Sequence, residues 1–255
     1  MFDTAILTLA SLFAGFVDAI VGGGGLVLVP ALFGVYPGAA PATLFGTNKG
    51  AAVWGTAWAT GQYARRVKLP WDALLPAAVA AFMGSFFGAW TITVVEPTGL
   101  RRALPFVLLA VLIYTLARKD LGRSHVPQHQ GRAQAALASA IGAGIGFYDG
   151  FFGPGTGSFF VFLFVRVLGF DFLHASASAK LLNTATNVAA LILFASKGHV
   201  WWHLAGVMAV ANVVGSLLGT RLALHHGAGF VRSVFVCVVT ALIAKTVWDG
   251  YFATG

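Results

Sequence analysis

Long apolar stretches separated by short polar breaks recur along the whole chain. Each half contains four of them, and most approach the roughly 20 residues that a helix needs to cross a bilayer. Because lipid leaves unpaired backbone groups unsatisfied, such stretches are expected to be helical. The pattern therefore predicts an all-α, polytopic membrane protein with about eight transmembrane helices, at approximately 4–35, 42–63, 72–94, 98–117, 135–167, 174–195, 201–223 and 230–250.

The two halves read as repeats of one unit. Adding 131 to a position in the first half reaches an equivalent residue in the second half without a gap. Equivalent pairs include Gly15 and Gly146, Asp18 and Asp149, Lys49 and Lys180, and Gly84 and Gly215. A polar, basic segment joins the halves, so we expect a four-helix transmembrane repeat at 1–117, a basic cytoplasmic linker at 118–134 and a second four-helix repeat at 135–255.

The composition fixes the class of protein. Hydrophobic residues make up 58% of the chain and charged residues 9%, which excludes an ordinary soluble domain. A net charge of +8 would suggest nucleic-acid binding in a soluble protein, but here most basic residues lie between apolar stretches, where they set membrane orientation. We expect a lipid bilayer and no nucleic acid as partner. The single cysteine, Cys237, excludes an intrachain disulfide and a thiolate metal cluster.

The basic residues also predict how the chain is threaded. If each glycine-broken stretch crosses once, every half has an even number of crossings, and the repeats are parallel. This arrangement, which we favour, puts more basic residues on the side of the linker and places both termini in the cytoplasm. If the breaks instead turn the chain back as re-entrant hairpins, the repeats are inverted. In the favoured threading one side holds the linker, Arg65, Arg66, Lys68 and Lys197, and the other holds Arg101, Arg102, Arg166, Arg221 and Arg232.

Glycines interrupt the first stretch of each half, at 22–25 and at 153–157. Breaks at membrane depth are tolerated where protein or water satisfies the freed backbone groups, typically around a cavity. A half-helix that begins after such a break directs its N–H groups and its positive dipole end toward that cavity, which suits an anion. The alternative is that the glycines only permit close helix packing.

Lysines in the second stretch of each half are the other candidate site. A lysine at mid-membrane depth costs at least about 2.5 kcal/mol, so Lys49 and Lys180 should face water, a partner or an anion, unless they snorkel to the headgroups. Asp18 and Asp149 could pair with them, cap a half-helix or carry a coupling proton. The candidate substrate-binding residues are Gly23, Gly24, Gly25, Thr47, Asn48, Lys49, Gly155, Thr156, Gly157, Lys180, Asn183 and Asn187.

These motifs resemble those of the TauE/SafE family of bacterial permeases and, within it, the YfcA-like branch. The resemblance is carried by GFVDAIVGGGG at 15–25 with GTNK at 46–49, and by GFYDGFFGPGTGSF at 146–159 with SAK at 178–180. It covers nearly the whole chain, although Pro30 of the first repeat meets Val161 in the second. It implies a multi-pass transporter of the bacterial inner membrane that moves sulfite, thiosulfate or organosulfonates.

The leading interpretation is an anion carrier that works by alternating access between the repeats. A channel, or a permease for a different small organic anion, is the alternative; a channel needs polar residues at all depths, whereas here they gather at one. A remote alternative is an intramembrane hydrolase using Ser158 or Ser178 with a histidine, but the histidines lie near stretch ends. No catalytic residue, metal or cofactor is expected, and glycine-rich helix faces would permit a homodimer.

Overall fold

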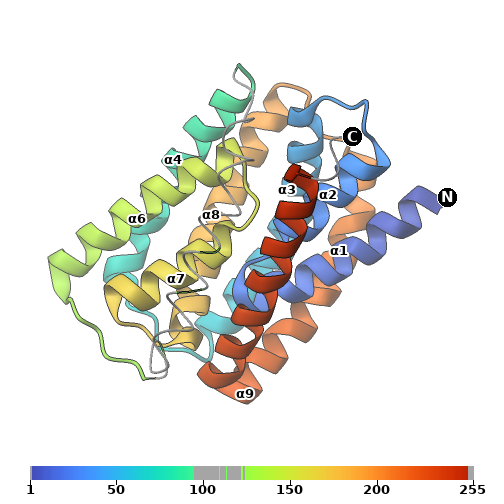
Figure 1. Cartoon of the computed structure of the whole chain (residues 1–255). Coiled ribbons are helices and arrows are strands. Elements are labelled where there is room, and N and C mark those ends of the chain that lie inside the picture. The colour runs from blue at the N-terminus through green and yellow to red at the C-terminus, as the bar shows by residue number, and fades with distance from the viewer. Residues whose placement is uncertain (1, 95–108, 110–112, 114–121, 123, 252–255) are drawn as a thin grey trace.

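The computed structural model describes residues 2–94, 109, 113, 122 and 124–251, and these residues form helices without any strand (Figure 1). The stretch expected at 98–117 lies almost wholly outside the described residues. By length and composition, four of the helices are able to cross a membrane, at Asp3–Val21, Trp71–Ile92, Phe172–Ser196 and Trp202–Ala241. The all-α, polytopic architecture expected from the hydrophobic pattern is therefore confirmed.

The helices follow the expected stretches closely. The first half contains α1 (Phe2–Val21), α2 (Gly25–Val35), α3 (Pro41–Ala64) and α4 (Trp71–Ile92). The second half contains α6 (Gly131–Phe151), α7 (Thr156–Leu168), α8 (Phe172–Ser196) and α9 (Trp202–Tyr251). The two stretches expected at 201–223 and 230–250 are two limbs of α9, which meet at the non-helical Gly227 (φ 71°, ψ −162°).

Local sequence signals explain several helix ends. Proline lacks an N–H and has a helical φ, so Pro41 starts α3 without losing a hydrogen bond. Asp171 caps α8 by accepting a hydrogen bond from the backbone N–H of His174 at 2.7 Å. Gly169 ends α7 in the left-handed conformation that glycine adopts without a Cβ clash.

Both glycine breaks reverse the direction of the chain. After Gly22 (φ 79°), α2 runs back along α1, and Leu28 and Leu32 of α2 join Leu7 of α1 in one apolar cluster. The approach is close, because a Cβ on Gly24 would lie 2.8 Å from the carbonyl oxygen of Ala14. In the second half, Gly153 and Gly155 take φ of 87° and 86°, and α7 turns back so that Phe159 packs edge-on against Tyr148 of α6.

The repeats are inverted, so the parallel arrangement favoured from the sequence is wrong. The equivalent helices α3 and α8 run antiparallel: Thr43 contacts His199, Thr56 contacts Asn187 and Thr60 contacts Thr184. The hairpins are the physical reason, since a break that turns the chain back removes one crossing from each half. Hydropathy could not show this, because a stretch that spans and one that returns have the same composition.

Small residues bring α1 against α9 and α4 against α6. A Cβ on Gly215 would lie 1.9 Å from the carbonyl oxygen of Leu12, and one on Gly84 would lie 2.3 Å from that of Ala143. Such close backbone approach is typical of small-residue helix packing in membranes. These glycine faces are occupied inside the chain, so they give no support to the homodimer that the sequence permitted.

The inverted arrangement regroups the basic residues. Arg66, after α3, and Arg221, near the end of the first limb of α9, line one cavity and therefore share an end of the molecule. Lys197, after α8, lies at the opposite end, where its Nζ donates to Thr93 Oγ1 at 2.8 Å beside the end of α4. The topology predicted from the sequence placed Arg66 with Lys197 on one side of the membrane and Arg221 on the other. It is wrong for these residues because each broken stretch was counted as one crossing.

Candidate functional site

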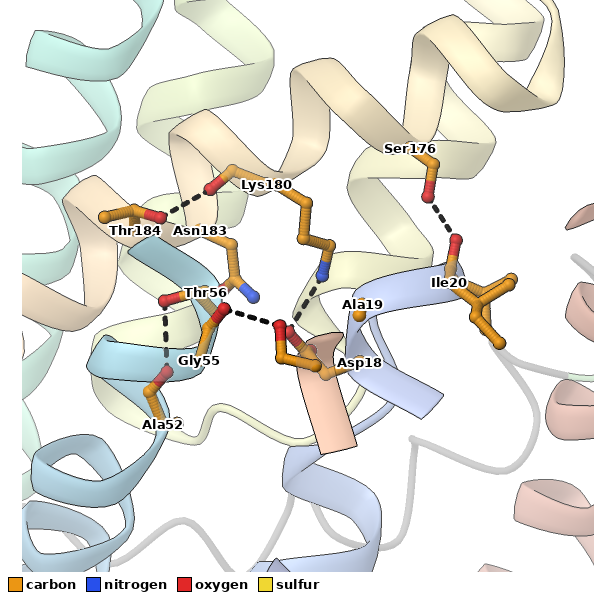
Figure 2. Close-up of polar contacts among 12 residues, drawn as sticks. Asp18, Ala19, Ile20, Ala52, Gly55, Thr56, Ser176, Lys180, Asn183 and Thr184 are labelled. Atoms are coloured by element: carbon orange, nitrogen blue, oxygen red, sulfur yellow. Dashed lines mark hydrogen bonds and ion pairs between the residues drawn. The ribbon is translucent and has the colours of Figure 1, made fainter. Parts of the chain in front are cut away.

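Two buried ion pairs join the halves of the chain. Lys49 Nζ lies 2.5 Å from Asp149 Oδ2, and Lys180 Nζ lies 2.9 Å from Asp18 Oδ2 (Figure 2 shows the second pair). Each lysine sits on the long helix of one repeat, and each aspartate lies just before the glycine break of the other. Because 49 and 180 are equivalent, as are 18 and 149, the two pairs are copies related by the repeat.

The burial of these pairs decides whether the two lysines have buried partners or snorkel to the headgroups. The side chains of Lys49 and Lys180 are 5% and 0% exposed, so neither snorkels to a headgroup layer. Buried charges cost several kcal/mol each in desolvation and persist only when paired and hydrogen-bonded. Lys49 meets this requirement with a second acceptor, Asn187 Oδ1, at 3.0 Å.

A cavity of about 30 Å³ lies between the two hairpins, beside both ion pairs. This is room for about one water molecule. Eleven of the residues singled out from the sequence line it: Asp18, Gly24, Gly25, Asn48, Lys49, Asp149, Gly155, Thr156, Gly157, Asn183 and Asn187. Residues that are far apart in the sequence and belong to both repeats thus converge on one point.

Three of the predicted binding residues do not line the cavity. Lys180 is buried behind Asp18, and the backbone of Gly23 accepts from Leu26 N in the first turn of α2. Thr47 Oγ1 donates to Thr43 O at 2.7 Å and accepts from the backbone N–H of Trp201 at 3.0 Å. Its hydroxyl holds α3 against the start of α9, which is a structural role.

Two polar residues of the lining were not singled out from the sequence. Thr56 lines the cavity from α3 and accepts a hydrogen bond from Asn187 Nδ2 at 3.3 Å. Asn212 reaches it from α9, and its Nδ2 donates to Ser11 O at 3.1 Å. The available signal was a lone asparagine in the middle of the apolar stretch 201–223, where a polar side chain is costly unless it has a partner.

The hairpin tips touch each other at the cavity. A Cβ on Gly22 or on Gly157 would lie 2.3 Å from the Cα of the other, so only glycine fits at this crossing. Carbonyls that the first break frees are used by the second hairpin: Ser158 N donates to Gly22 O and Ser158 Oγ donates to Val21 O, both at 3.1 Å. Protein, rather than lipid, therefore meets the backbone groups of the break.

Ion pairs and helix dipoles together set the electrostatics of the cavity. The two ion pairs cancel in formal charge, while α2 and α7 both begin at the cavity and direct their positive dipole ends into it. Asn48 Oδ1 is buried without a hydrogen-bond partner in the described part of the chain. A side-chain amide carries an acceptor oxygen and a donor NH₂ group, so rotation of the Asn48 amide can present either of them to a bound group.

One cluster of potential metal ligands lies away from the cavity. His125, Asp171 and His174 place ligand atoms within 4.8 Å of one another. His174 Nδ1 lies 2.8 Å from Asp171 Oδ2, and the imidazoles of His125 and His174 stack with centroids 3.9 Å apart. Partial desolvation, together with the neighbouring His174, lowers the pKa of His125 below its usual 6.5. This cluster could not be predicted from residue spacing, because His125 comes from the linker and lies far along the chain from Asp171 and His174.

No serine–histidine pair of the kind a hydrolase needs occurs among the described side chains. Ser158 Oγ donates to Val21 O, while His174 is bound to Asp171 and His199 to Thr43. The nucleophile and base of such an enzyme must come within hydrogen-bond reach.

Comparison with known proteins settles the family. The model of the family described as sulfite exporter TauE/SafE matches residues 7–246. The chain belongs to the TauE/SafE family. It is therefore a membrane transporter and not an enzyme. The resemblance of the two glycine motifs to this family is confirmed.

Several curated relatives of the TauE/SafE chain are similar over nearly their whole length. A probable membrane transporter protein, ORF9, of Sinorhizobium sp is 37% identical over 96% of this chain and 92% of its own. The probable membrane transporter protein YfcA of Escherichia coli strain K12 is 36% identical over 96% and 90%. A probable membrane transporter protein of Haemophilus influenzae is 34% identical over 97% and 96%. No solved structure matches the chain.

Proposed function

We propose that this TauE/SafE protein carries a small sulfur-containing anion, such as sulfite, thiosulfate or an organosulfonate, by alternating access. The observation that supports this most is the central cavity, where two half-helices begin and where Lys49 and Asn48 lie. Most N–H groups in the first turns of α2 and α7 already donate to backbone carbonyls, so the attraction for negative charge comes from the positive dipole ends of the two half-helices, which face one point. The substrate class follows the family description.

Lys49 is the charged group best placed to bind the anion directly. It lines the cavity and donates to both Asp149 and Asn187, so an entering oxyanion can replace one of these acceptors on the same ammonium group. Lys180 acts through Asp18, because Asp18 lines the cavity while Lys180 does not. The release of Asp149 or Asp18 on anion binding provides a carboxylate able to take up a coupling proton.

The small size of the cavity supports a carrier over a channel. A space of about 30 Å³ holds about one water molecule, so an oxyanion needs the hairpins to separate before it enters. Inverted repeats that rock against each other open such a site first to one side and then to the other. The crossed ion pairs tie the halves together in the closed state. A channel for the same anion would keep a polar pathway open at both ends.

The orientation that the inverted fold supports differs from the one inferred from the sequence. Arg65, Arg66, Lys68 and Arg221 gather at the end where α3 joins α4 and α9 turns, which is the lower end in Figure 1. Basic loops stay in the cytoplasm, so this end faces inward in a bacterial inner membrane. The start of α1 lies at the opposite end with Lys197, since Ser11 Oγ donates to Met208 O near the start of α9. The N-terminal end of α1 is then periplasmic.

Uptake into proteoliposomes tests the proposed transport. The protein is reconstituted and given labelled sulfite or thiosulfate, with sulfate and a simple organosulfonate as competitors. We expect wild-type uptake that Lys49→Ala abolishes and that Lys197→Ala, an exposed lysine far from the cavity, retains. If Lys49→Ala takes up the anion as well as wild type does, the anion does not bind in this cavity. If folded, inserted protein takes up none of the sulfur anions, the proposed substrate class is wrong, although the family membership is unaffected.

A further inference from the structure

A second cavity opens at the basic end of the molecule, well away from the central site. Its volume is about 580 Å³, within the range of ligand pockets and many times that of the central cavity. The turn after α3, the first turn of α8 and the last turns of the first limb of α9 meet around it, so it bridges the two repeats. It is lined by Arg66, Leu173, Arg221, Leu222, Leu224 and His225.

Two arginines give this cavity a positive charge. Arg66 and Arg221 are both exposed, and neither has a carboxylate partner among the side chains that the structure describes. Arginine presents a planar set of N–H donors that matches a phosphate in a bidentate fashion, and it is held less tightly by water than lysine. His225, on the same face, adds a further donor.

The rest of the wall is apolar. Leu173 and Leu224 are half-buried, and Leu222 is 37% exposed. A small inorganic anion would use the arginines but leave these leucines in contact with water. A ligand that has an anionic head and a hydrocarbon part covers both kinds of surface at once.

We propose that this cavity binds the headgroup of an anionic phospholipid. The phosphate lies between Arg66 and Arg221, and the first carbons of the acyl chains lie along Leu222 and Leu224. Basic pockets between transmembrane helices on the cytoplasmic side bind anionic headgroups, and the cavity lies at the end where the loops are basic. A lipid bound there contacts one repeat through Arg66 and the other through Arg221, and so stabilises the chain across the boundary between its halves.

The thermal stability of the purified full-length protein, measured in detergent with added lipid, tests this proposal. We expect phosphatidylglycerol to raise the midpoint of unfolding more than phosphatidylcholine does. The variant Arg66→Gln/Arg221→Gln should lose this difference, and its apparent affinity for phosphatidylglycerol should fall on the order of fivefold for each arginine removed. The matched control is Arg132→Gln, an exposed arginine at the start of α6 that does not line the cavity, which should retain the difference.

Two further arms separate the sources of the ligand chemistry. Inorganic phosphate alone should not reproduce the shift, whereas an equal shift with phosphate would make this a site for a free anion and overturn the lipid assignment. Leu222→Gln should weaken the effect of phosphatidylglycerol without creating a response to phosphate. Retention of the full phosphatidylglycerol preference by the double arginine variant, shown to be folded by circular dichroism, would also overturn the proposal. Since no arm measures transport, failure here leaves the proposed anion transport untouched.

Discussion

Thr56 and Asn187 are equivalent residues of the two repeats, and they are hydrogen-bonded to each other, Asn187 Nδ2 to Thr56 Oγ1 at 3.3 Å. Equivalent residues touch only where the pseudo-twofold axis passes close to both. In inverted repeats this axis lies in the membrane plane. Both residues line the central cavity, so the cavity lies on the axis. A site on this axis is presented in a related way to either side of the membrane, as alternating access requires.

The crossed ion pairs predict a specific pattern of stability. Lys180→Ala leaves the Asp18 carboxylate buried without its partner, and breaking a buried pair in this way costs about 3 to 5 kcal/mol. The double variant Asp18→Asn/Lys180→Ala leaves no charge behind and should recover much of that loss. Thermal unfolding of the detergent-solubilised variants measures the difference. A double variant as unstable as Lys180→Ala would mean that the unpaired Asp18 carboxylate is not the source of the loss.

The contact of the hairpin tips predicts intolerance to a single methyl group. Gly157→Ala places a Cβ 2.3 Å from the Cα of Gly22, so the hairpins must separate, with an expected cost of about 1 to 3 kcal/mol. Gly206→Ala is the control, because this helical glycine has no atom within 4 Å of its added Cβ. The midpoints of thermal unfolding should differ by several degrees between the two variants. Equal midpoints would show that the tips are free to move apart.

Asn48 Oδ1, which has no hydrogen-bond partner among the described residues, predicts an effect on anion binding. Asn48→Asp preserves the shape of the side chain but adds a negative charge inside the cavity, next to the site proposed for the anion. We expect the concentration of sulfite or thiosulfate that gives half-maximal uptake to rise at least about tenfold, which corresponds to about 1.4 kcal/mol. The variant Asn48→Ser keeps a neutral polar group, so this concentration should rise less than in Asn48→Asp. Equal values for Asn48→Asp and wild type would place the anion elsewhere.

The sequence carried the local features of this site but not their arrangement. Glycine breaks and membrane-depth lysines are visible because backbone strain and buried charge are properties of single positions. The direction of the chain after Gly22 is not visible, because α2 is equally apolar whether it continues or returns. The pairing of Lys49 with Asp149, rather than with Asp18 of its own repeat, depends on that direction. The assumption that each glycine-broken stretch crosses the membrane once also placed Lys197 at the same end as Arg66.

The stacked histidines predict a loss of stability in mild acid. Partial desolvation, and then the proximity of His174, lowers the pKa of His125 in the folded protein, so the neutral imidazole is the form that the fold favours. A group with a lowered folded pKa contributes stability above its unfolded value, here 6.5, and this contribution is lost as the pH falls through the folded value. His125→Phe keeps an aromatic ring against Phe170 but does not titrate. The fall in unfolding midpoint between about pH 7.5 and 5.5 should therefore be smaller in this variant than in wild type.

The inverted fold finally predicts which residues face the periplasm. In a Cys237→Ser background, which removes the single native cysteine, Lys197→Cys and Arg66→Cys place one thiol at each end of the molecule. A membrane-impermeant maleimide added to intact cells should label Lys197→Cys and leave Arg66→Cys unlabelled, whereas disruption of the membrane should expose both. Both wild-type side chains are exposed, so either thiol can react once the reagent reaches it. The opposite labelling pattern would show the reverse orientation, with the basic end in the periplasm, although basic loops usually stay in the cytoplasm. Labelling of both variants in intact cells would instead contradict the placement of Lys197 and Arg66 at opposite ends, and with it the inverted relation of the repeats.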